Sequence, residues 1–285
     1  MTGHFLQRLK LGLMTVTGVA KRGFFSPYRY AAGVPDQVEH YAEIAAMMRD
    51  ATPAMNSVLA NIQSRASELL AIGGDVPEPR WQQDWFTGLD AAAAYAIVSE
   101  LRPKRIVEVG SGHSTRFMAR AIRDGGFGCQ FTAIDPFPRA TLAGLDVHWE
   151  KSLLSADDFS HFDALESGDI AFIDSSHLLW PGTDVDILFA RLLPRLASGV
   201  LIHIHDVFLP DGYPGEWHWR GYTEQQGVAA LLAGGGFDIM FSSCFCRTRL
   251  DVAGMAPVIG ILPVPAEMYE TSLWLRKGSA RTWRP

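Results

Sequence analysis

Acidic and imidazole side chains stand at the ends of several short apolar runs in this 285-residue chain. Apolar runs of four or five residues are typical of buried strands, and the ligands of an open α/β sheet bind at the carboxyl ends of its strands. Imidazole, with an unperturbed pKa of about 6.5, can take up a proton near neutral pH. The sequence thus predicts one polar site that contains the following residues: Glu108, Asp135, Asp174, His205 and Asp206.

Structural roles remain open for three of these carboxylates. Asp174 and Asp206 are also suited to cap the helices that would follow their strands, and capping does not exclude a second role. Asp135 stands directly before Pro136 and could start an Asx turn instead of binding a ligand.

A strand, a glycine turn and the start of a helix follow one another around Gly110 and Gly112. Glycine permits backbone geometries that a side chain would obstruct. Ser114 and Thr115 are good N-cap types for a helix predicted over residues 116–123. Together these features predict the cofactor-binding corner of a doubly wound α/β fold.

The details of this corner favour one cofactor. A dinucleotide-binding fingerprint has a third glycine three residues after the second, and here that position is Thr115. Glu108 would repel a pyrophosphate but suits a cofactor that carries a cationic amino acid. Asp135, 23 residues past Gly112, could accept hydrogen bonds from both hydroxyls of a ribose. The sequence therefore favours S-adenosylmethionine and argues against an NAD-linked dehydrogenase.

Three motifs stand in a characteristic order along the chain. They are Val109-Gly-Ser-Gly-His-Ser-Thr115, Phe172-Ile-Asp-Ser-Ser-His177 and His205-Asp206-Val207. Over roughly residues 81–277 the chain resembles the class I S-adenosylmethionine-dependent methyltransferases, and within them methyltransferase family 24. The resemblance implies a Rossmann-like doubly wound sheet of seven strands. It also implies these cofactor-binding residues: Glu108, Gly110, Ser111, Gly112, Ser114, Thr115, Asp135, Asp174 and Ser175.

Methyl transfer is an in-line displacement at a sulfonium carbon, and its leaving group needs no protonation. For a hydroxyl acceptor, the enzyme must align the nucleophile and remove its proton. His205 is the best candidate for this general base, ahead of His177 and His203. We therefore predict His205, Asp206 and Asp174 as catalytic residues.

A divalent metal offers a second mechanism. Some methyltransferases of this superfamily bind a cation with carboxylates after the fourth and fifth strands, and Asp174 and Asp206 match those places. A bound Mg²⁺ would lower the pKa of the acceptor hydroxyl. His205, however, stands where a hard cation would prefer another oxygen ligand.

An aromatic segment over residues 208–220 directly follows the predicted catalytic pair. Loops after strand ends commonly carry specificity on a rigid scaffold. Arg220 could hold an acidic group of the acceptor. Four aromatic side chains could line an apolar acceptor pocket, or could pack internally or at a subunit contact: Tyr213, Trp217, Trp219 and Tyr222. Trp81 and Trp85 could cover the cofactor or pack on the sheet.

Composition narrows the class of protein. A net charge of −6 argues against a nucleic-acid binder, which would normally carry a basic face. The three cysteines form no disulfide framework, so a reducing, cytoplasmic setting is expected. Cys244 and Cys246 are predicted to be buried on a strand. We predict a helical extension over 1–79 and a methyltransferase domain over 80–285, divided by a glycine- and proline-rich linker.

The segment from Phe5 to Phe25 alternates apolar with basic residues. Its longest uncharged run, Leu11–Ala20, is about ten residues long and too short to span a bilayer. The pattern predicts an amphipathic helix against the protein, a partner subunit or a membrane surface, or else a poorly ordered extension. A homodimer would explain its aromatic residues most simply, and no transmembrane segment is predicted elsewhere.

Periodicity places the remaining elements. Helices are predicted over residues 36–50, 54–71, 90–101 and 188–196. Strands are predicted over residues 130–134, 147–150, 170–173, 200–204, 237–242 and 272–276, the last as an antiparallel edge strand. The predicted function is S-adenosylmethionine-dependent O-methylation of a small hydroxylated metabolite or sugar. The alternative is a non-catalytic S-adenosylmethionine-binding or assembly protein.

Overall fold

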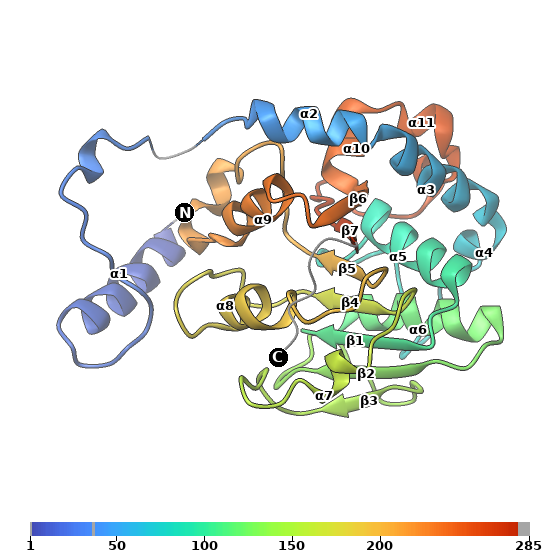
Figure 1. The fold of residues 1–285 in the computed structure, drawn as a ribbon, viewed down its shortest axis with the longest axis horizontal. Coiled ribbons are helices and arrows are strands. Elements are labelled where there is room, and N and C mark those ends of the chain that lie inside the picture. The colour runs from blue at the N-terminus through green and yellow to red at the C-terminus, as the bar shows by residue number, and fades with distance from the viewer. Residues whose placement is uncertain (1, 36–37, 279–285) are drawn as a thin grey trace.

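The computed structural model describes residues 2–35 and 38–278, and within them seven strands form a single sheet (Figure 1). The order is β3-β2-β1-β4-β5-β7-β6, with β7 antiparallel to both of its neighbours and β1 to β5 parallel. The strands are β1 Arg105–Val109, β2 Gln130–Ile134, β3 His148–Glu150, β4 Ile170–Ile173, β5 Leu201–Ile204, β6 Phe237–Ser242 and β7 Leu273–Lys277. The predicted doubly wound, seven-stranded sheet is confirmed.

The strand predictions agree with the structure to within one residue at each end, but the place of β7 was predicted wrongly. β7 lies between β5 and β6, so β6 and β3 are the edges of the sheet. The apolar run Leu273–Leu275 is buried, as expected for a strand covered on both faces. Its neighbour β6 is only partly buried over Phe237–Met240, which fits an edge.

The helices lie between and around the strands. They are α1 Thr2–Val16, α2 Ala42–Asp50, α3 Thr52–Ser64, α4 Ala66–Leu70, α5 Gly88–Leu101, α6 His113–Gly125, α7 Ser160–Asp163, α8 Asp184–Ile187, α9 Glu224–Ala233, α10 Ser243–Arg249 and α11 Val252–Met255. The alanine-rich α5 is buried over 88–98 and packs against α6 and α3. Its small side chains permit this close packing on several sides.

Several helix predictions need correction. α6 begins at His113 rather than at 116, because Gly112 is its N-cap instead of Ser114 or Thr115. The helix predicted over 54–71 is broken at Arg65 into α3 and α4. The one predicted over 36–50 begins at 42, with residues 36 and 37 outside the described part.

Two further segments differ from expectation. The helix predicted over 188–196 is a continuation of α8 in π-helical form that ends at Leu192. Cys244 and Cys246 are buried as predicted, but on helix α10 rather than on a strand. The Oγ of Ser242 accepts a hydrogen bond from the amide of Phe245 and so caps this helix.

Helices α2 to α4 share the hydrophobic core of the sheet. Met48, Met55, Leu59 and Ile62 are fully buried in the same cluster as the strand residues. By contrast, α1 stands apart from the sheet, at the end of a long arm (Figure 1). The division at the linker 72–79 remains a prediction. None of the described helices has both the length and the apolar character that a membrane-spanning helix needs.

Candidate active site

A cavity of about 740 Å³ opens at the carboxyl ends of β1, β2, β4 and β5. Residues from all three sequence motifs line it, although they are far apart along the chain. The predicted site residues that line it are Gly110, Ser111, Asp135, Asp174, Ser175, His205 and Asp206. Four other predicted cofactor-binding residues are not in its lining: Glu108, Gly112, Ser114 and Thr115.

The glycine turn brings the ends of β1 and β4 into close contact. The amide of Asp174 donates to the carbonyl of Val109, and Gly110 has a φ of +79°. A Cβ at Gly110 would lie 1.7 Å from the carbonyl oxygen of Asp174. Only glycine fits there, because any side chain would collide with a neighbouring backbone.

Glu108 lies beneath this turn and is fully buried. Its Oε1 accepts a 2.5 Å hydrogen bond from Ser114 Oγ, and its Oε2 accepts a 2.6 Å bond from Thr115 Oγ1. Burial raises the pKa of Glu108 to about 8, against the lowering effect of these two hydroxyls. The three residues thus bind one another and hold the start of α6, whereas the sequence had suggested that they face a cofactor.

Asp135 lines the cavity and also starts an Asx turn. Its Oδ1 accepts from the amide of Phe137 at 2.7 Å, and its Oδ2 accepts from the amide and the hydroxyl of Ser111 at 2.7 and 3.0 Å. A carboxylate has about four lone-pair sites, so these bonds leave it able to accept from a ligand as well. The two roles considered for Asp135 are therefore compatible.

The Oγ of Ser175 is buried and has no hydrogen-bond partner among the described residues. Ser175 lines the cavity, and buried polar groups in native proteins are rarely left unpaired. A bound molecule with polar groups would satisfy it, so this wall fits a cofactor such as S-adenosylmethionine. On the same cavity, Trp85 lies under the guanidinium of Arg139 at 3.9 Å, whereas Trp81 packs on Phe117 away from it.

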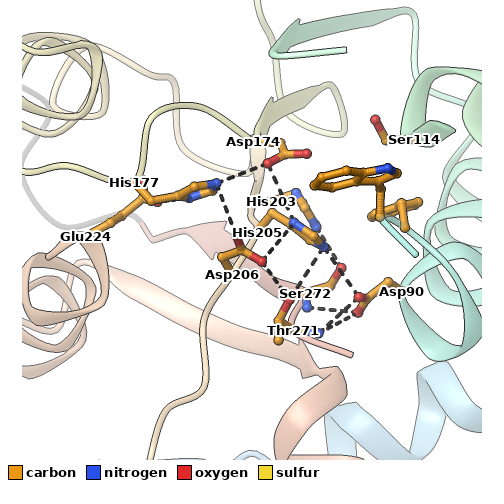
Figure 2. A network of polar contacts seen from close by, with 12 residues as sticks. Asp90, Ser114, Asp174, His177, His203, His205, Asp206, Glu224, Thr271 and Ser272 are labelled. Atoms are coloured by element: carbon orange, nitrogen blue, oxygen red, sulfur yellow. Dashed lines mark hydrogen bonds and ion pairs between the residues drawn. The ribbon is translucent and has the colours of Figure 1, made fainter. Parts of the chain in front are cut away.

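Two histidines and two aspartates form a closed ring in the lining of the cavity, next to Ser175, and Figure 2 shows them facing one another. His177 Nε2 lies 3.3 Å from Asp174 Oδ1 and 3.3 Å from Asp206 Oδ2. His205 Nδ1 lies 3.6 Å from Asp174 Oδ1 and 3.4 Å from Asp206 Oδ1. We call these four residues the His-Asp ring.

Each imidazole of the ring also faces a carboxylate on its far side. His177 Nδ1 lies 2.8 Å from Glu224 Oε2, and His205 Nε2 lies 3.4 Å from Asp90 Oδ2 (Figure 2). Asp90, on α5, is held in turn by the amides of Thr271 and Ser272. Both carboxylates were missed at the sequence level.

The carboxylates control the protonation of the ring. Burial lowers the pKa of His205, but the charges of Asp174 and Asp206 outweigh it and raise that pKa well above its ordinary value. The pKa of His177 is raised well above its ordinary value in the same way. Burial raises the pKa of Asp174, but the two imidazoles reverse this and hold it well below its usual range. At neutral pH the ring therefore holds positively charged histidines, whereas the sequence argument had assumed an unperturbed His205.

His203 does not belong to the ring. Its imidazole stacks on Phe172 at 3.7 Å and its Nε2 lies 2.9 Å from Ser272 Oγ. Burial and the nearby His205 charge lower the pKa of His203 well below its ordinary value. It is a neutral core residue, in keeping with its lower rank as a base.

Aromatic residues close the cavity beyond the ring. Trp217, Tyr222 and Arg220 line it, whereas Trp219 and Tyr213 do not. The guanidinium of Arg220 lies 4.3 Å from the ring centroid of Trp217, and its Nη1 donates to the hydroxyl of Tyr222. A second segment, Glu267–Tyr269, completes this wall.

Comparison with known proteins found one matching family model and several similar solved structures. Residues 107–207 match the model of methyltransferase family 24, described as a methyltransferase domain. The solved structure titled "cmcI-N160 SAH" is 16% identical, with 76% of this chain and 91% of that chain covered and a TM-score of 0.39. SAH-bound methyltransferase PaMTH1 of Podospora anserina is 16% identical, with 90% and 100% covered and a TM-score of 0.40.

An O-methyltransferase from Bacillus cereus in complex with SAH is 15% identical, with 78% of this chain and 90% of that chain covered and a TM-score of 0.43. No curated protein sequence matches the chain. The match over residues 107–207 covers the glycine turn and the ends of β4 and β5, which carry the cavity. Together with the seven-stranded sheet, the match shows a domain similar to methyltransferase family 24 over residues 107–207, about a third of the chain.

Proposed function

We propose that this chain is an S-adenosylmethionine-dependent methyltransferase that methylates a hydroxyl oxygen of a small metabolite or sugar. The observation that carries the proposal is the His-Asp ring, which shares one cavity with the glycine turn and Asp135. A hydroxyl acceptor must lose a proton, and the ring supplies a base where the cofactor end of the cavity meets the acceptor end. The volume of about 740 Å³ lies in the usual range for small-molecule sites.

The cofactor end of the cavity would hold S-adenosylmethionine, which supplies a methyl group on a positively charged sulfur. Asp135 would accept hydrogen bonds from the ribose hydroxyls, and Ser175 would pair its buried Oγ with a polar group of the cofactor. Gly110 keeps the backbone at the turn free of a side chain. Glu108 acts indirectly, because it holds Ser114 and Thr115 at the start of α6.

His205 would remove the acceptor proton at its Nδ1 atom. Asp90 faces Nε2 and would hold a hydrogen there, so an imidazolium that loses its Nδ1 proton would have a free lone pair on Nδ1. When the acceptor oxygen attacks the methyl carbon, its proton passes to Nδ1 and the sulfur keeps the electron pair of the broken bond. Asp174 and Asp206 stabilise the imidazolium that forms.

Mg²⁺ does not fit the ring well. A hard cation prefers oxygen ligands in octahedral geometry, whereas half of the ring is imidazole nitrogen. Among the described residues, no group of three or more histidine, cysteine or acidic side chains is arranged to hold a metal ion. The proposed mechanism uses the chain's own residues, so turnover by this route should persist after dialysis against EDTA.

The test combines calorimetry with methyl transfer. Wild-type protein, His205→Ala and the exposed-surface control His148→Ala are titrated with S-adenosylhomocysteine and assayed with labelled S-adenosylmethionine on a panel of hydroxylated metabolites and sugars. We expect cofactor binding in all three and turnover lost only in His205→Ala. Undiminished turnover in His205→Ala would rule out the base. Cofactor binding without transfer to any acceptor by the wild type would favour a non-catalytic binding protein.

A further inference from the structure

The charges of the chain are strongly segregated. Residues 2–35, which we call the basic arm, contain five of the 25 lysines and arginines and none of the 31 aspartates and glutamates. The arm therefore carries a formal charge of +5 and the rest of the chain −11. A segment so different from the acidic body is expected to have an anionic partner of its own.

Helix α1 in this arm presents an apolar stripe to solvent. At 100° per residue, five large apolar side chains fall on one face, and all of them are exposed: Phe5, Leu6, Leu9, Leu13 and Val16. Arg8 and Lys10 lie on opposite edges of this stripe, one residue to each side of its central Leu9. An exposed apolar face edged by cations is the pattern of a helix that lies in a lipid interface.

The other face of α1 is different. Leu11 and Met14 are only half-exposed, and the Oγ1 of Thr15 accepts a hydrogen bond from the amide of Arg22 in the segment that folds back on the helix. The apolar stripe is thus not the face that the protein itself uses for packing.

The rest of the basic arm also combines exposed aromatic side chains with basic residues. Phe25, Tyr28 and Tyr30 are exposed, and Arg29 stands between the two tyrosines. Aromatic residues near basic ones are typical of segments at a membrane–water boundary. Phe24 stacks on Trp180 with ring centroids 5.2 Å apart, and this contact ties the arm to the body near α8. The arm is therefore joined to the body through Phe24, and Arg8 shares a groove with Trp217, while the five side chains of the stripe stay exposed.

We propose that the basic arm docks this methyltransferase on a lipid bilayer that contains anionic lipids, with the stripe of α1 at the acyl boundary. The cationic edges of α1 meet the headgroups, and the acidic body stays in water because the same surface repels it. A second copy of the chain is a weaker candidate than a bilayer for the partner that covers the stripe. The body has four exposed apolar side chains on which the stripe of a second copy could pack. All four line the active-site cavity, which that second copy would then cover: Trp85, Phe137, Leu153 and Tyr269.

Co-sedimentation of the full chain with vesicles tests the proposal. Phosphatidylcholine vesicles are compared with vesicles that also contain phosphatidylglycerol, at low and at high salt. The variant L9D/L13D places two carboxylates in the stripe, and L70D/I261D makes the same change at two exposed apolar positions of the body. A third variant, L9A/L13A, keeps good helix formers and only removes apolar area.

The wild type should bind anionic vesicles, with binding weakened by salt and with little binding to phosphatidylcholine alone. L9D/L13D should lower the partition coefficient at least about tenfold, L9A/L13A should lower it less, and L70D/I261D should leave it unchanged. Absence of binding by the wild type, or equal binding by L9D/L13D, would refute the proposal. So would a dimer in sedimentation velocity that only the stripe variants lose, because the stripe would then belong to a second copy.

Discussion

His205 Nε2 lies 3.4 Å from Oδ2 of Asp90, a residue 115 positions earlier in the chain. Asp90 is buried on the alanine-rich helix α5, and the amides of Thr271 and Ser272 hold its carboxylate in place. A core helix and the start of β7 thus fix the orientation of an imidazole in the cavity. The arrangement resembles the carboxylate–imidazole pairs that set the tautomer of catalytic histidines in other enzymes.

Replacing Asp90 with asparagine should reveal this orienting role. An amide can donate to Nε2, so Asp90→Asn favours the tautomer in which Nδ1 carries the hydrogen and cannot accept a proton. We expect kcat to fall by about 10²- to 10⁴-fold while S-adenosylhomocysteine binding changes little. Asp157→Asn, at an exposed position, is the matched control. A loss of affinity as large as the loss of kcat would instead indicate a folding defect, which thermal unfolding of both variants would detect.

The rate of methyl transfer should rise with pH. Because the neighbouring carboxylates raise the pKa of His205 well above 6.5, the free base exists only in a minor fraction at neutral pH. The pH profile of kcat/KM should therefore increase through an inflection well above 6.5. An inflection near 6.5, or a flat profile, would contradict His205 as the base.

The contribution of His177 to the free energy of unfolding should fall as the pH rises, whereas the rate of methyl transfer should increase. The raised folded-state pKa of His177 stabilises the protein fully below the unfolded value of about 6.5, and this contribution is lost as the pH rises through the folded value. In urea unfolding, the difference in free energy of unfolding between wild type and His177→Gln should depend on pH over this alkaline range. A difference that does not change with pH would show that His177 is neutral.

Glu108 should tolerate loss of its charge but not loss of its side chain. Its folded pKa of about 8 exceeds the unfolded value of about 4.3, so the free energy of unfolding falls as the pH rises between them. Glu108→Gln should reduce this pH dependence, whereas Glu43→Gln at an exposed position should not. Glu108→Ala leaves a cavity and two unpaired hydroxyls, and should cost about 2–4 kcal/mol. Urea titrations at pH 5 and pH 8 measure both effects.

Substitution of Gly110 should be costly because of the neighbouring backbone as well as because of its positive φ. Gly168 has a φ of +92° with open space around its Cβ position, so Gly168→Ala tests the backbone cost, about 1–2 kcal/mol. Gly110→Ala adds a collision with the Asp174 carbonyl and should cost more than about 3 kcal/mol or prevent folding. Similar melting temperatures for the two variants would show that the strand ends can move apart.

Features that depend on neighbouring residues, such as strand bounds, were predicted from the sequence. Features that depend on contacts between distant residues were not. Strands β2, β4 and β6 were predicted with their observed bounds, because short apolar runs between turn residues encode them locally. The place of β7 in the sheet and the burial of Asp90 depend on contacts across the whole fold. No local pattern distinguished Asp90 from an ordinary charged residue at the start of a helix.

The same distinction applies within the site. Asp174, His205 and Asp206 were predicted because strand ends converge in any open α/β sheet. The inward direction of Glu108 was not, because its partners, Ser114 and Thr115, had been assigned to the cofactor. The role of His177 depends on Glu224 and on the strand ends together, which the spacing along the chain does not reveal.

The two walls of the cavity differ in how they are built. The His-Asp ring stands largely on strand ends, whereas the aromatic wall comes from two loops joined by a hydrogen bond from the hydroxyl of Tyr269 to Glu216. If this wall selects the acceptor, as proposed, the two loops can change while the ring stays as it is. Because this hydrogen bond joins the loops, a graft intended to alter acceptor choice has to carry both segments together.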